Sequence, residues 1–137
     1  MISSKQLFYT LSSIILLVVV VAIMPSYHIK AQVENEENDP LIILSTIKNL
    51  LQKSITELNA GNYTGASDLV DIAYIDNYEY IEDPLKELDQ DLMEETEIMI
   101  REDFAGAIDD KKPIEEITTL HNNIKTNLDK AEQLFKQ

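Results

Sequence analysis

Residues 71–84 read DIAYIDNYEYIEDP, and this stretch carries three of the six tyrosines of the chain. Its apolar and aromatic residues recur at helical spacing. Its last two residues, Asp83 and Pro84, form a common helix start, in which a capping carboxylate precedes a proline at the first helical position. We therefore predict that one helix ends at about Glu82 and that the next begins at Asp83–Pro84.

Two further signals divide the chain before this junction, and Pro113 opens the last helix after it. Asp39–Pro40 is a second capped start, and Gly61 is a typical C-terminal cap. Apolar residues recur every three or four positions throughout, and no segment alternates with a period of two long enough to form a strand. The four predicted helices span residues 40–61, 62–82, 84–110 and 113–135. Short connections between amphipathic helices favour an all-α, antiparallel up-down four-helix bundle over residues 40–137.

The first 31 residues have a different character. Lys5 precedes an apolar run over residues 7–24, which Pro25 interrupts. The run is short for a membrane span and long for the core of a signal peptide. Residues 1–31 are therefore predicted either to be a signal peptide cleaved after Ala31 or to remain as a hydrophobic N-terminal helix that anchors the chain in the membrane. Both interpretations place the rest of the chain outside the cytoplasmic membrane, with residues 32–39 as an acidic linker.

The charge of the remaining chain is strongly negative. From Gln32 onward there are nine basic and 25 acidic residues, a formal charge of −16. This balance argues against nucleic acid, whose phosphates require clustered Lys and Arg, and it suits a cation-rich setting or a basic partner. The chain has no cysteine, which excludes disulfides, thiolate metal sites and a lipid anchor on cysteine. No constellation of nucleophile and base is recognisable, so we predict that the protein is not an enzyme.

Glu79 and Glu82 form an E-x-x-E pair, and Glu94 and Glu97 form a second one. Residues three apart lie on adjacent turns of a helix, so each pair can share one cation through carboxylate oxygens. Iron and calcium suit such oxygen ligands. The alternative is an acidic helix face that is only solvated.

A helical wheel of 100° per residue places Asp71, Ile75, Tyr78 and Glu82 on one outward stripe. Ile75 and Tyr78 would then form an apolar contact surface flanked by carboxylates. Ordinary packing against a neighbouring helix is the other interpretation.

The same wheel places Asp103 within the apolar stripe of the third helix. A buried carboxylate without a partner is costly, and the candidate partners are Arg101, His121 and the tyrosine hydroxyls. His121 lies on the apolar face of the fourth helix, either as a satisfied core residue or as a metal ligand that meets carboxylates of the second or third helix. No histidine lies three positions after a glutamate, which excludes the Glu-x-x-His pattern of di-iron bundles.

Asn62, Tyr63 and Thr64 form an N-x-T sequon at the predicted turn between the first two helices. Outside the membrane, Asn62 is a candidate acceptor for N-glycosylation.

Residues 66–134 resemble the extracytoplasmic helical domain associated with high-affinity iron permeases. The matching residues are Ala73-Tyr74, Tyr78-Glu79-Tyr80-Ile81-Glu82, Glu97, Phe104, Ala107-Ile108 and the segment 113–117. Tyr78 stands where that family usually has Phe, and Ala105 stands where an arginine is expected. The likeness does not extend to the membrane helices that carry transport, so it implies an accessory domain associated with iron.

Two functions follow from these patterns. The first is an exported or membrane-tethered, non-catalytic bundle that binds a cation, or a cation-loaded partner, through Glu79 and Glu82. Asp71 and Tyr78 lie beside that pair, and the further candidate ligands are Glu97, Asp103 and His121. The second is an extracytoplasmic module that binds a membrane transporter or another protein through the stripe of Ile75 and Tyr78 and requires no metal.

Overall fold

The computed structural model describes residues 39–137, and this part of the chain is helical without any strand. The all-α prediction with four helical segments is therefore confirmed. The predicted hydrophobic helix within residues 1–31 and nearly all of the linker lie outside the described residues.

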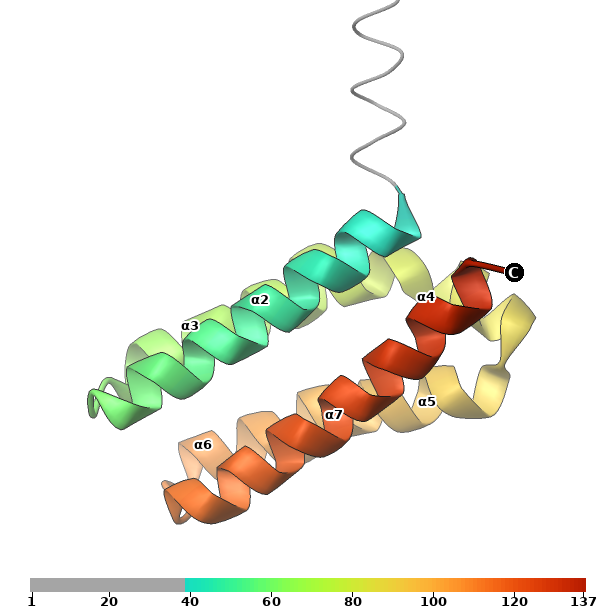
Figure 1. The fold of residues 1–137 in the computed structure, drawn as a ribbon. Coiled ribbons are helices and arrows are strands. Elements are labelled where there is room, and N and C mark those ends of the chain that lie inside the picture. The colour runs from blue at the N-terminus through green and yellow to red at the C-terminus, as the bar shows by residue number, and fades with distance from the viewer. Residues whose placement is uncertain (1–38) are drawn as a thin grey trace, which may run out of the picture. The chain divides into compact units, whose positions relative to one another are not determined.

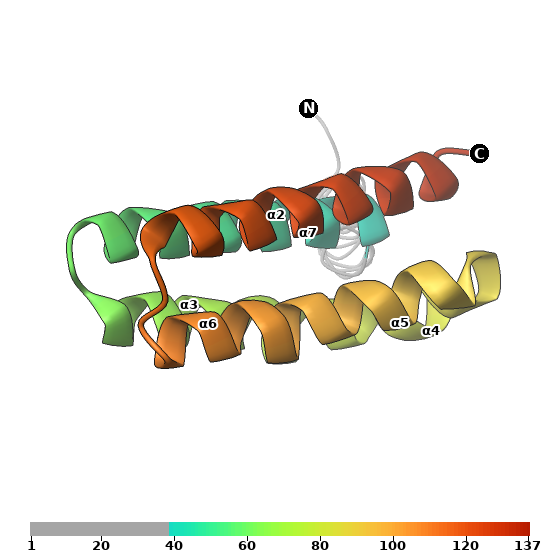
Figure 2. The same cartoon turned by 90° about the horizontal axis from the view of Figure 1, so that it is seen from below.

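The helices form four rods, each nearly continuous. Rod 1 is α2 (Pro40–Asn59), and rod 4 is α7 (Ile114–Phe135). Rods 2 and 3 each contain a π-helical segment between two α-helices: α3 (Tyr63–Ala73), η1 (Tyr74–Tyr78) and α4 (Glu79–Leu88) in rod 2, and α5 (Gln90–Ile98), η2 (Met99–Phe104) and α6 (Ala105–Asp109) in rod 3. Rod 1 packs on rods 2 and 4, and rod 3 packs on rods 2 and 4 (Figure 1). Consecutive rods run in opposite directions (Figure 2).

Local signals fix both ends of rod 1, as the sequence predicted. The Asp39 carboxylate accepts a hydrogen bond of 2.8 Å from the backbone N–H of Leu41, with Pro40 at the first helical position. Gly61 has φ of +79°, the left-handed conformation that favours glycine. The N–H groups of Gly61 and Asn62 bond back to the carbonyls of Leu58 and Glu57, so the helix closes with a Schellman motif.

The predicted helix start at Asp83–Pro84 is wrong. Pro84 lies inside α4, and the chain breaks at Asp89, which has an extended backbone (φ −159°, ψ 95°). The Asp89 carboxylate caps α5 by accepting a hydrogen bond of 2.9 Å from the N–H of Leu92. Proline disfavours a helix interior, but Ile81 and Leu85 on either side of Pro84 are fully buried, and their burial offsets that cost.

The π-helical segments decide which residues face the core. A π turn uses hydrogen bonds between residues five apart, as between the N–H of Glu79 and the carbonyl of Tyr74, and so holds one more residue than an α turn. In rod 2 the buried face therefore steps from Ala73 directly to Tyr78. In rod 3 the buried Phe104 takes the core position, and the neighbouring Asp103 is exposed.

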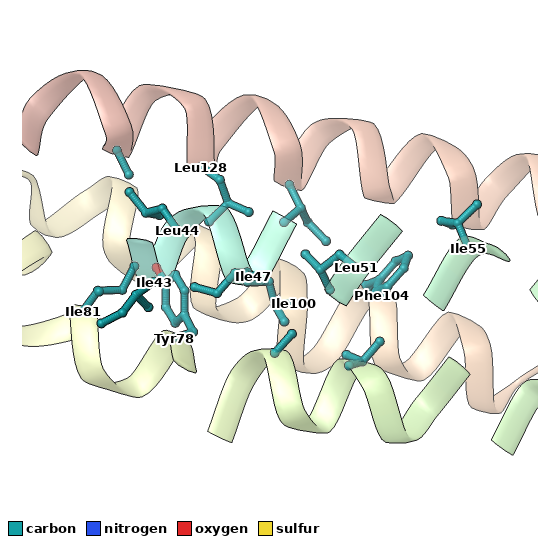
Figure 3. Close-up of a cluster of buried hydrophobic side chains, with 14 of the residues drawn as sticks. Ile43, Leu44, Ile47, Leu51, Ile55, Tyr78, Ile81, Ile100, Phe104 and Leu128 are labelled. Atoms are coloured by element: carbon teal, nitrogen blue, oxygen red, sulfur yellow. The ribbon is translucent and has the colours of Figure 1, made fainter. Parts of the chain in front are cut away.

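Two predictions are wrong for this reason: Tyr78 is fully buried rather than on an outward stripe, and Asp103 is not in the core. Figure 3 shows the Tyr78 and Phe104 rings among the aliphatic side chains of the core. The labelled aliphatic residues are Ile43, Leu44, Ile47, Leu51, Ile55, Ile81, Ile100 and Leu128.

Candidate functional site

Four polar side chains meet where the π-helical parts of rods 2 and 3 pack together. We call Tyr74, Glu82, Glu97 and Arg101 the acid–tyrosine cluster. The Tyr74 hydroxyl donates a hydrogen bond of 3.2 Å to Oε1 of Glu97, and Nη1 of Arg101 donates to the same oxygen at 3.2 Å. The Arg101 guanidinium also lies 5.8 Å from the centre of the Tyr74 ring, a cation–π distance. Glu97 therefore accepts one hydrogen bond from each of the two rods.

Glu82 is the least satisfied member of the cluster. Its side chain is half-buried, and its Oε1 atom is buried without a hydrogen-bond partner among the described residues. Burial, followed by the nearby charge of Glu97, raises the pKa of Glu82, and the Tyr74 hydroxyl offsets only part of this rise. An ionised Glu82 is thus an uncompensated charge that a proton or a cation would neutralise.

Tyr78 lies beneath the cluster and fixes its position. The Tyr78 hydroxyl donates a hydrogen bond of 2.8 Å to the carbonyl oxygen of Met93, which joins rods 2 and 3. Its ring stacks on Tyr74 with 6.2 Å between the ring centres. Burial raises the pKa of Tyr78, so its hydroxyl stays protonated as a donor. Tyr78 is a core residue, whereas its predicted companion on the surface, Ile75, is 53% exposed.

The other predicted ligands are only partly brought together. Glu79 is exposed, yet its charge lies close enough to contribute to the raised pKa of Glu82. Asp71 and Asp103 are both exposed and do not join the cluster. Among residues 39–137, no group of three or more His, Asp or Glu side chains is arranged to hold a metal ion.

His121 lies beside basic rather than acidic side chains, which agrees with the interpretation as a core residue and not with the alternative of a metal ligand among carboxylates. Its ring is buried, and the centre of the ring lies 6.3 Å from the centre of the Phe104 ring. It lines a cavity of about 50 Å³ together with Lys48, Leu51, Gln52, Lys125 and Leu128. Burial is the main cause that lowers the pKa of His121, and the charge of Lys125 lowers it further. The neutral imidazole is therefore a packed core group.

A second charged cluster joins rods 1 and 4, and we call it the lysine–carboxylate cluster. Lys48 of rod 1 bonds to Asp129 at 2.7 Å and also to Glu132, both on rod 4. Lys125 bonds to Asp129 at 2.6 Å, and Lys136 bonds to Glu132. Hydrogen bonds from Lys136 and Lys48 lower the pKa of Glu132 to about 2.

Sequence reasoning did not assign Tyr74 or Arg101 to a site with Glu82 and Glu97. The available signal was spacing by four, which puts Glu97 and Arg101 on one face of a helix and Tyr74, Tyr78 and Glu82 on another. Which two faces pack together depends on the π turns, and these have no comparable signal in the sequence.

Comparison of the chain with family models, with curated proteins and with solved structures finds no match. The resemblance to the domain associated with iron permeases therefore stays a prediction. No helix within residues 39–137 is long and apolar enough to cross a membrane.

Proposed function

We propose that the chain is a non-catalytic helical domain with an antiparallel up-down arrangement, exported or tethered to the cell membrane by its N-terminal segment, which binds a cation between Glu82 and Glu97. The observation that carries this proposal is the buried, unpartnered Oε1 of Glu82 beside a second carboxylate. A bound cation would supply the missing partner and relieve the repulsion between the two charges.

The ligands in reach define the class of cation. Glu82 and Glu97 provide carboxylate oxygens, and the Tyr74 hydroxyl provides a third oxygen. Hard cations such as iron and calcium prefer oxygen ligands, and water would complete the coordination. Glu79, three residues before Glu82, is exposed and adds negative charge beside it. The resemblance also implies an association with a membrane iron transporter, and we include this association in the proposal.

Calorimetric titration of residues 32–137 with calcium, magnesium and iron salts tests the proposal. The fragment contains the whole described core, and we expect one ion to bind per chain. Replacing Glu82 and Glu97 together by Gln should abolish this binding without loss of helicity. The matched control, Asp68→Asn with Glu87→Gln, removes the same charge from exposed positions of rod 2 and should bind normally.

The proposal fails if the Glu82→Gln, Glu97→Gln variant binds as well as the wild-type chain. It also fails if every cation binds weakly and salt abolishes binding equally for all of them, because a solvated acidic surface behaves in that way.

The second candidate function is a protein-interaction module, and exposed apolar side chains on the outer part of rod 2 favour it. Ile72, Ile75 and Tyr80 are 41%, 53% and 66% exposed. Large exposed apolar groups are typical of contact surfaces when they gather on one face. If a partner is found, its affinity should fall in the variant Ile72→Ser, Ile75→Ser while cation binding stays unchanged.

A further inference from the structure

Asn62 occupies the turn between rods 1 and 2, at the end of rod 1 remote from Asp39. With 20 residues in α2 at 1.5 Å per residue, this turn lies about 30 Å along the helix from the point where the N-terminal segment joins. Tyr63 meets Lys111 of the turn between rods 3 and 4 there, with 5.6 Å from the ammonium to the ring centre. Asn62 thus lies at the end of the domain remote from Asp39.

The two polar atoms of the Asn62 side chain have separate roles. Oδ1 accepts a hydrogen bond of 3.1 Å from the N–H of Gly65 and so caps α3. Nδ2 donates one of its two hydrogens to Oε2 of Glu57, at 2.6 Å. The residue is exposed, and its second amide hydrogen is not required for the cap. A substituent on Nδ2 is therefore compatible with both hydrogen bonds.

Gly65 makes room for this amide. A Cβ atom at position 65 would lie 2.4 Å from Nδ2 of Asn62, closer than any real contact. The local sequence thus combines an exposed acceptor amide, the space that it needs and the hydroxyl of Thr64 two residues later.

We propose that Asn62 is an N-glycosylation site at the end of the domain remote from Asp39. The donor is a glycosyl group carried on a lipid diphosphate. A bond forms between Nδ2 and C1 of the sugar, the bond from C1 to the phosphate oxygen breaks, and the phosphate leaves with the electron pair. The amide proton passes to a base of the transferase. The inference rests on the extracytoplasmic location contained in the proposed function, but it requires no cation.

Translation of the full chain with microsomes that contain a glycosyltransferase tests the inference. The readout is one mobility shift that an endoglycosidase removes. The shift should be present in the wild-type chain and in Thr64→Ser, and absent from Thr64→Ala and Asn62→Asp. Asn62→Asp keeps an oxygen that can cap α3 but loses the hydrogen bond to Glu57, whereas Thr64→Ala leaves both hydrogen bonds of Asn62 in place, so a loss of the shift in Thr64→Ala is not a folding defect.

An Asn-Gly-Thr tripeptide added after Gln137 provides a reference acceptor. Modification of this tail without modification of Asn62 would overturn the inference and leave the extracytoplasmic location intact. If neither site is modified, the chain is not translocated, and both the location and the inference fail.

Discussion

The acid–tyrosine cluster and the lysine–carboxylate cluster use similar residues and reach opposite electrostatic states. Each contains two carboxylates and joins two rods. In the lysine–carboxylate cluster three lysines serve Asp129 and Glu132, and hydrogen bonds from those lysines lower the pKa of both acids. In the acid–tyrosine cluster Arg101 is the only basic residue; it bonds to Glu97, and the pKa of Glu82 is raised. The number of basic side chains in reach, from four positions away on the same helix and from the facing rod, decides whether an acid is a structural ion-pair partner or a candidate ligand.

The largest effect on stability is expected from removing Tyr78, the buried residue that supports the acid–tyrosine cluster. Tyr78→Ala leaves a cavity in the core beneath Tyr74 and should lower the free energy of unfolding by about 3–5 kcal/mol. Tyr78→Phe removes only the hydrogen bond to Met93 and should cost about 1 kcal/mol. Urea unfolding followed by circular dichroism measures both values.

The control for this prediction is Tyr80→Ala. Tyr80 is 66% exposed, so its loss should change the free energy of unfolding by less than about 0.5 kcal/mol. Equal effects at Tyr78 and Tyr80 would contradict the arrangement in which Tyr78 supports the cluster.

A second prediction applies the same substitution to both clusters in the absence of added cations. Glu82→Gln removes an uncompensated charge and should raise the free energy of unfolding at pH 7 by about 1 kcal/mol. Glu132→Gln removes a carboxylate that two lysines hold and should lower that free energy. Urea midpoints at pH 7 give the signs, and a shared sign would refute the contrast between the clusters.

The dependence of stability on pH should separate the two clusters further. The pKa of Glu132 falls from 4.5 to about 2 on folding, so its stabilisation is complete above pH 4.5 and is lost as the pH falls toward 2. The pKa of Glu82 rises on folding from 4.5, so stability is lost as the pH increases from 4.5 through the raised value. Profiles of the urea midpoint against pH should therefore flatten above pH 4.5 in Glu82→Gln and below it in Glu132→Gln.

The sequence predicted those parts of the fold that depend on local chemistry. Asp39, Pro40 and Gly61 bound rod 1 where their capping preferences placed them, because a cap involves only neighbouring residues. The break after rod 2 was predicted at Asp83–Pro84 rather than at Asp89. That error arose because core packing of Ile81 and Leu85 keeps the helix intact across the proline.

The candidate site was predicted only in part. Glu82 and Glu97 were selected as members of two separate E-x-x-E pairs, with Glu79 and Glu82 as the first ligands, and the charge of Glu97 raises the pKa of Glu82. Tyr78 and Asp103 were misplaced because a uniform step of 100° does not hold across a π turn. The pairing of Tyr74 with Glu97 depends on contact between two rods, 23 residues apart in sequence, which periodicity along one helix does not contain.

The smallest effect is expected from changing a single basic side chain in each cluster, and it compares the two clusters most directly. Arg101→Gln removes the positive charge that competes for Glu97, so affinity for an added cation should rise roughly three- to tenfold. Lys125→Gln removes the lysine four residues before Asp129, but Lys48 still neutralises that acid, and cation affinity should stay unchanged. Calorimetric titration of both variants measures the difference. If Arg101→Gln weakens binding, the guanidinium holds Glu97 in position for the ion instead of competing with it, and the acid–tyrosine cluster would then be a site organised by its arginine.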